Sequence, residues 1–207
     1  MPLAFGPAMT HVVASHDSGD FPVMTELASA GQLRASLMRW MLICVPGILL
    51  LGLLSGRIAG SGPGNAWFDA LVKPAVYPPP ATFGIVWTVL YILMGASLAV
   101  IASARGAPGR GMALALFAVQ LVLNLAWSPL FFAGHRITGA LFLIAVLDLA
   151  AIATIALFWR VRPLAGMLLL PYLAWIMFAT YLNYEFRVAN PGADGQEGSG
   201  AAQRIEL

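Results

Sequence analysis

Five long apolar segments constrain what this chain can fold into. They lie at about residues 39–58, 82–103, 112–133, 137–159 and 164–187. Four of them have about 22 residues, enough for a helix rising 1.5 Å per residue to cross ~30 Å of hydrocarbon. Backbone amides find no water in that layer, so the segments must be helical. The sequence therefore predicts an all-α membrane protein, a bundle of five transmembrane helices.

The composition indicates an integral, multi-pass protein whose main partner is the lipid bilayer. Of the 207 residues, 60% are hydrophobic and 10% are charged, whereas about a quarter of the residues of a soluble domain are charged. The net charge is only +2, and the basic residues are scattered over the ends of the segments, so no nucleic-acid-binding surface is expected. The single cysteine, Cys44, excludes an internal disulfide and a multi-cysteine metal site.

The apolar segments define a five-helix domain at residues 38–188 with a tail on each side. Residues 1–37 and 189–207 lack long apolar runs, so we expect a mobile N-terminal extension and a disordered C-terminal tail. Nothing apolar would hold the potential metal ligands of the first tail in place, and we do not interpret them as a site. They are His11, His16, Asp17 and Asp20.

The first connection, at residues 59–80, is much longer than the other turns. Loops of this length are usually functional or disordered. Its prolines fix φ and remove amide donors, and Trp67 and Phe68 favour burial. We therefore expect an ordered, packed loop that acts as a lid for a flat apolar ligand.

Three of the segments each carry a stripe of aromatic and amide side chains at helical spacing. The stripes consist of Phe83, Trp87 and Tyr91; of Gln120, Asn124 and Trp127; and of Tyr172, Trp175, Ala179 and Asn183. If they converge, they form an aromatic box for a planar hydrophobic ligand. Alternatively, the tryptophans belong to the core or the interfacial belt and the amides hold helices together. Composition alone favours this second interpretation.

Catalytic chemistry finds little support in the residues. There is no phosphate-binding loop, no paired carboxylates and no histidine inside a span, so no catalytic residue, metal site or required cofactor is assigned. Asp148 is the one acid well inside a segment. We expect it to pair with a polar group on a neighbouring helix or to face water, because a proton relay would need a second titratable partner.

Four blocks of sequence resemble the translocator protein family, also called TspO. They are WFDALVKPAVYPPP at 67–80, FGIVWTVLY at 83–91, QLVLNLAWSPLFF at 120–132 and PYLAWIMFATYLNYEFR at 171–187. Their order and separation, joined to five spans, make the match specific, and a bacterial-type member is expected. The resemblance implies a homodimer of five-helix bundles. It also implies a pocket for porphyrins, such as protoporphyrin or haem, and for sterols and synthetic ligands in animal members.

The resemblance also assigns roles to residues of this sequence. Trp87, Trp175, Asn124 and Trp127 match the family's pocket positions, and the small Ala179 leaves room for a flat ring. With the stripes and the lid, the expected ligand-binding residues are Trp67, Phe68, Phe83, Trp87, Tyr91, Asn124, Trp127, Tyr172, Trp175, Ala179 and Asn183. The carboxylates of a porphyrin are expected to meet Lys73 or Arg136. The implied function is transport, sensing or stress-linked regulation of tetrapyrroles.

Three alternatives stay open. Some bacterial relatives have a tyrosine where this chain has Phe68, and that tyrosine is linked to light- and oxygen-dependent porphyrin breakdown. Phe68 has no phenol, so we favour binding over catalysis. The run Leu182, Tyr184 and Arg187 fits a proposed sterol-binding pattern, although interfacial anchoring explains it as well. A third possibility is a structural membrane partner.

The membrane and the dimer face are not assigned. Helical spans are typical of inner membranes, but some family members are found in outer membranes, so either bacterial membrane remains a candidate. Five small residues could permit close helix contact. They are Gly95, Ser97, Ala113, Ala115 and Ala118.

Overall fold

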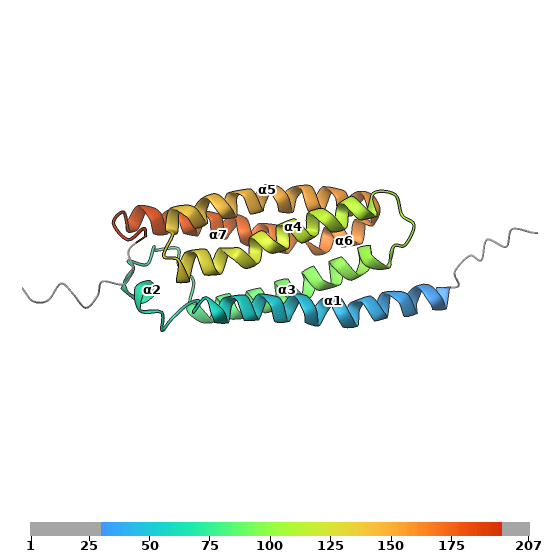
Figure 1. Cartoon of the computed structure of the whole chain (residues 1–207), viewed down its shortest axis with the longest axis horizontal. Coiled ribbons are helices and arrows are strands. Elements are labelled where there is room, and N and C mark those ends of the chain that lie inside the picture. Colours follow the sequence, from blue (N-terminus) through green and yellow to red (C-terminus); the bar gives the residue numbers. More distant parts are fainter. Residues whose placement is uncertain (1–29, 196–207) are drawn as a thin grey trace, which may run out of the picture.

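The computed structural model describes residues 30–195 and consists of a bundle of helices (Figure 1). Its elements are α1 (Ala30–Ile58), α2 (Ala66–Ala70), α3 (Pro80–Ser103), α4 (Arg110–Ser128), the π-helical turn η1 (Pro129–Ala133), α5 (Ile137–Val161), α6 (Pro163–Leu168) and α7 (Leu170–Ala189). Within the described range, five helical stretches are long and apolar enough to cross a membrane, α4 continuing into η1 and α6 into α7. The predicted all-α, five-helix membrane bundle is confirmed.

Proline and glycine set several of the helix boundaries. Pro80 and Pro163 each stand at the start of a helix, where a missing N–H costs nothing. Gly109 precedes α4 with φ of +77°, a conformation that glycine adopts readily. Pro171 has no N–H to donate to the preceding turn, and the helix is interrupted at Leu169, between α6 and α7.

The first helix is longer than predicted, beginning at Ala30 rather than at about residue 39. The expected N-terminal extension is therefore helical over residues 30–37. Its residues are mostly good helix formers, and Leu37 packs against the main core. Residues 1–29, with His11, His16, Asp17 and Asp20, lie outside the described residues.

The segment after α7 differs from the expected disordered tail as far as residue 195. The Asn190 side chain donates to the Val72 carbonyl (3.0 Å) and accepts from the Val72 amide (2.8 Å). The Gly195 amide donates to the His135 carbonyl at 2.8 Å. Backbone partners on the long loop and on the α4–α5 turn therefore hold residues 190–195, which we call the C-terminal strap. Residues 196–207 lie outside the described part of the chain.

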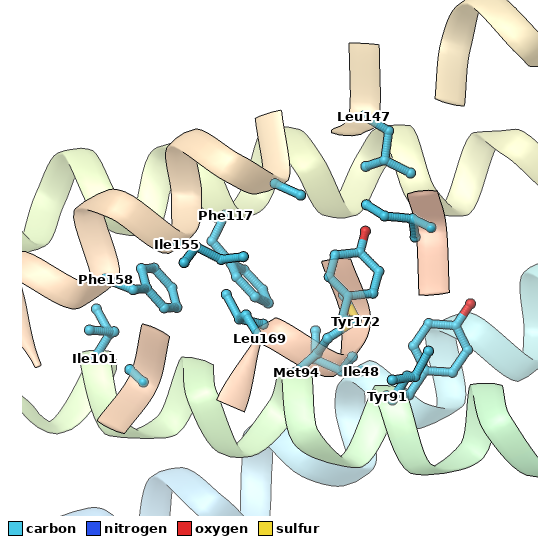
Figure 2. Close-up of a cluster of buried hydrophobic side chains, with 14 of the residues drawn as sticks. Ile48, Tyr91, Met94, Ile101, Phe117, Leu147, Ile155, Phe158, Leu169 and Tyr172 are labelled. Carbon is cyan, nitrogen blue, oxygen red and sulfur yellow. The ribbon is translucent and has the colours of Figure 1, made fainter. Parts of the chain in front are cut away.

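The main hydrophobic core lies between α3, α4, α5 and α7 (Figure 2). The rings of Phe117 and Phe158 stack there at 5.6 Å between centroids, with Ile101, Ile155 and Leu169 around them. A second cluster sits at the end of the bundle that carries α2 and joins rings from the long loop, η1 and α7. Trp127 packs against both clusters.

Helices α1 and α3 lie side by side (Figure 1), and they approach closely because Gly95 of α3 has no side chain to hold the α1 backbone away. A Cβ on Gly95 would lie 2.6 Å from the Val45 Cα. The neighbouring Ser97 donates to the Ala165 carbonyl at 2.7 Å. Among the small residues considered for close contact between protomers, Gly95, Ser97 and the buried Ala113 are thus used inside the protomer.

Candidate ligand-binding cavity

A cavity of about 760 Å³ opens between the helices near the end that carries α2. Its wall comes from the second half of α1, the long loop, the first half of α3, the end of α4, η1, α5 and α7. Pockets for drug-sized ligands usually measure about 300–1,000 Å³. The bundle therefore encloses a space suited to one organic molecule.

The three predicted stripes converge on this cavity. The predicted residues that line it are Phe68, Phe83, Trp87, Tyr91, Asn124, Trp127, Trp175, Ala179 and Asn183. Trp87 stacks on Tyr91 at 5.1 Å, and Phe83 meets Trp175 edge to face at 5.8 Å. The aromatic and amide faces of the three helices thus meet at one cavity. The alternative interpretation, with tryptophans in the core or the interfacial belt, did not require this convergence.

Two predicted ligand contacts, Trp67 and Tyr172, are not part of the cavity wall. Trp67 lies in α2, where its indole stacks on His135 at 4.6 Å and donates to the Ala193 carbonyl at 3.4 Å. Tyr172 is fully buried behind Asn124. Both side chains therefore support residues of the wall from outside the cavity.

A chain of buried hydrogen bonds fixes the amide at the centre of the wall. Tyr91 donates to Asn124 Oδ1 at 3.3 Å, and Asn124 Nδ2 donates to the Tyr172 hydroxyl at 3.4 Å. Tyr172 in turn donates to Gln120 Oε1 at 2.8 Å. Such a network holds its members in one arrangement because each buried polar group depends on the next. Gln120 belonged to its predicted stripe but not to the predicted site.

One buried donor of the cavity wall has no partner among the described residues. It is the indole Nε1 of Trp175. A buried polar group without a hydrogen bond is uncommon and calls for an explanation. An acceptor atom on a bound molecule would satisfy this N–H.

The wall nearest α5 is held by Trp127 and Asn183. The Trp127 indole donates to Asn183 Oδ1 at 3.2 Å, and Asn183 Nδ2 donates to the Ile137 carbonyl at 3.0 Å. Immediately after α4, the π-helical turn carries Phe131 and Phe132 into the wall. π-helical turns often occur at functional sites. Phe131 and Phe132 belong to the 120–132 block that resembles the family, but their position in the cavity wall depends on this turn.

The long loop packs over one end of the cavity. Asn65 caps α2 by accepting from the Phe68 amide at 3.0 Å, and its Nδ2 donates to the Phe132 carbonyl at 3.2 Å. The Phe68 ring contacts Phe132 and Phe186 at 5.1 and 5.7 Å. Tyr77 continues this aromatic layer and stacks on Phe83 at 5.5 Å. Burial, together with the nearby Asp69, raises the pKa of the Tyr77 phenol.

The basic residues expected to meet ligand carboxylates are placed elsewhere. The Lys73 ammonium donates to the carbonyls of Phe68 (2.6 Å) and Leu71 (2.9 Å), so it closes the loop on itself. Desolvation lowers its pKa, partly opposed by the charge of Asp69. Arg136 lines a separate hollow outside the bundle cavity. Arg57, at the end of α1, lines the cavity instead.

Asp148 pairs with a polar group on a neighbouring helix, which was one of the two outcomes expected for it. Its carboxylate accepts from the Thr180 hydroxyl at 2.7 Å and so links α5 to α7.

The three residues of the proposed sterol pattern do not form one site. Leu182 lines the cavity, whereas Tyr184 is exposed on the outer face of α7. Arg187 donates to Thr138 at 3.1 Å. The three residues of the pattern thus face different surroundings.

Several residues of the wall carried no signal in the sequence. They include Gly52, Leu53, Gly56, Ser61, Asn65, Tyr77, Ser128, Ile144, Leu147 and Ile176. Those in the spans look like ordinary apolar or small helix residues. Asn65 could have been found as the N-cap of a short helix, but its reach to Phe132 depends on the folded loop.

Comparison with known proteins supports the resemblance. Residues 43–189 match the model of the TspO/MBR family. The chain is 40% identical to the translocator protein of Homo sapiens over 136 residues, which are 65% of this chain and 80% of that protein. It is 36% identical to the tryptophan-rich protein TspO of Chlorobaculum tepidum over 150 residues, 72% and 94% of the two chains. It is 40% identical to the tryptophan-rich sensory protein of Cereibacter sphaeroides over 121 residues, 58% and 75%.

Proposed function

The chain belongs to the TspO/MBR family, and on this premise we propose that its cavity binds porphyrins or related flat tetrapyrroles within the membrane. The observation that carries the proposal is the convergence of Trp87, Trp127 and Trp175 on one cavity, whose wall also contains Asn124, held by Tyr91 and Tyr172. Indole faces stack on planar conjugated rings and shield them from water. An amide and a free indole N–H add a few oriented hydrogen bonds, as small-molecule sites usually do.

The names of the relatives favour a role in moving or sensing such a ligand. One is called translocator protein and another tryptophan-rich sensory protein. We extend these roles to this chain as transport or sensing of tetrapyrroles, including stress-linked regulation. The lid over a cavity inside the bundle is compatible with both, because either role requires the ligand to enter and leave.

A titration of protoporphyrin followed by its Soret band tests the proposal. The purified chain in detergent is compared with Trp87→Ala and Trp175→Ala. We expect saturable binding at micromolar ligand in the wild type. Each substitution should weaken it about 10-fold, because one lost stacking contact and its buried area are worth about 1–2 kcal/mol.

Trp159→Phe provides the matched control, because Trp159 is partly exposed on α5 and lies outside the cavity. It should bind like the wild type, and circular dichroism should show intact helices in all variants. Absence of saturable binding in the wild type would contradict the proposal. So would equal affinity in all four proteins, because the ligand would then sit elsewhere.

A second candidate function, light-dependent porphyrin breakdown, is favoured by one observation. Position 68 has no phenol, but Tyr77 and Tyr91 both line the cavity. Tyr91 donates to Asn124, which leaves Tyr77 as the phenol on the lid side. Illumination with protoporphyrin in air separates binding from turnover. Soret loss that exceeds the protein-free rate and falls in Tyr77→Phe would favour the enzyme, and loss at the protein-free rate would favour binding alone.

A further inference from the structure

We propose that Arg57 and Ser61 form an anion subsite at the mouth of the cavity, so that the preferred ligand is a flat apolar molecule with a carboxylate at one edge. The inference rests on the proposed function and narrows the class of ligand. It also moves the expected carboxylate contact away from Lys73 and Arg136, which the fold places outside the cavity wall.

The cavity wall carries charge of one sign only. Over residues 30–195, the lining side chains include a single cation, Arg57, and no aspartate or glutamate. The acid that contacts this end of the loop is Asp69, which accepts from the Gly64 amide at 2.9 Å and does not line the cavity. A cavity with one positive charge and otherwise uncharged walls favours an anionic group on its ligand.

The Arg57 guanidinium is available to a ligand. No hydrogen bond or ion pair joins it to another group of the described chain, and the side chain is exposed. Lys73 and Arg110, by contrast, are bound to backbone groups: Arg110 donates to the carbonyls of Ile101 and Ala102 at 3.1 and 2.9 Å. The fork of five N–H donors on arginine suits a carboxylate, which it can bind through two parallel hydrogen bonds.

The backbone beside Arg57 leaves room for such a group. Gly60, Gly62 and Gly64 have φ of +61°, +98° and +94°. Cβ atoms placed on Gly62 and Gly64 would meet nothing within 4 Å, so this face of the turn is open. The turn is nevertheless held, because the Ser61 amide donates to the Gly56 carbonyl at 3.0 Å. The Ser61 hydroxyl lines the cavity and makes no hydrogen bond within the described residues.

The depth of Arg57 in the bundle fits the same ligand. It lies in the last turn of α1, where a membrane-spanning helix reaches the polar interface and a charge is tolerated. The tryptophans line the same cavity deeper in the bundle. A molecule with an apolar ring and a carboxylate edge would therefore bury the ring and keep its charge near water.

The experiment compares protoporphyrin IX with its dimethyl ester, which keeps the ring and removes both charges. Soret titrations are made with the wild type, Arg57→Gln, Arg57→Lys and Ser61→Ala. We expect Arg57→Gln to weaken binding of the free acid about 10-fold and to leave the ester within about 2-fold, because a charge-assisted pair is lost only for the acid. Arg57→Lys should recover part of the loss, and Ser61→Ala should cost less than Arg57→Gln.

Arg136→Gln is the matched control, because it removes one positive charge near the same end of the bundle but outside the cavity. It should leave both affinities unchanged. The subsite is overturned if Arg57→Gln weakens acid and ester alike, weakens neither, or acts no more strongly than Arg136→Gln. These outcomes leave the proposed cavity standing. Failure of both probes to bind the wild type would overturn the proposed function and the subsite together.

Discussion

Replacing Gly95 with alanine should destabilise the bundle even though alanine is the better helix former. Gly95 lies in α3, and a Cβ there would be 2.6 Å from the Val45 Cα and 2.8 Å from the Cys44 carbonyl oxygen. Both are backbone atoms of α1, so no side chain can rotate away. Helix α1 would have to retreat until the 2.6 Å contact reached the 3.4 Å at which ordinary contact begins.

The magnitude follows from two opposing contributions. Overpacking of a tight contact costs about 1–3 kcal/mol, and the alanine gains up to about 1 kcal/mol in helix propensity. The expected net loss is about 1–2 kcal/mol, roughly 2–8 °C in Tm for a chain of this size. Because α1 also supplies Gly52 and Arg57 to the cavity wall, the affinity for protoporphyrin should fall as well.

Gly47→Ala is the matched control for this experiment. Gly47 lies inside α1, and a Cβ there would meet nothing within 4 Å. This variant should be unchanged or up to about 1 kcal/mol more stable. Unfolding is followed by circular dichroism in detergent, by heating and by denaturant titration. If Gly95→Ala proves as stable as Gly47→Ala, the close packing of α1 on α3 does not contribute in the way argued.

Three further predictions concern the cavity, the strap and the lid. Ala179→Leu should fill part of the cavity and weaken protoporphyrin binding at least 10-fold, whereas its Tm should stay within about 2 °C of the wild type. Asn190→Ala removes both hydrogen bonds to Val72. It should lower the local stability of the lid by about 1–2 kcal/mol, seen as faster amide exchange at residues 60–79 and not in α5. Because burial raises the pKa of Tyr77 above its usual 10.0, the unfolded chain loses this proton first as the pH rises. Stability should therefore fall as the pH passes 10, and Tyr77→Phe should reduce that fall; an identical pH profile in the variant would contradict it.

The helix faces that line the cavity could be predicted from the sequence, because the spacing of their aromatic and amide residues is a local property of each helix. Phe83, Trp87 and Tyr91 recur at helical spacing, so their common face needs no knowledge of the partner helix. The same holds for Asn124 and Trp127. Five apolar segments and the hydrogen-bond requirement of a membrane interior then leave a helical bundle as the outcome.

Other features were decided by contacts between distant parts of the chain. Trp67 was expected in the cavity, but α2 turns it towards His135 and Ala193. Tyr172 shares the face of Trp175 on a helical wheel, yet the approach of α4 places it behind Asn124. A pattern along one helix shows which residues share a face, but not how deep each one lies once its neighbours are packed.

The sequence alone determined the class of fold, the number of spans and the helical faces that meet at the cavity, because hydropathy and periodicity act within each segment. Only the tertiary structure decided which cation reaches the cavity, how the lid is held and where α1 can touch α3. Arg57 lines the cavity and Lys73 does not, because the loop folds the lysine back onto its own backbone carbonyls. The strap became ordered because Asn190 meets Val72. These choices depend on backbone groups far apart in the chain, whose pairing no local pattern encodes.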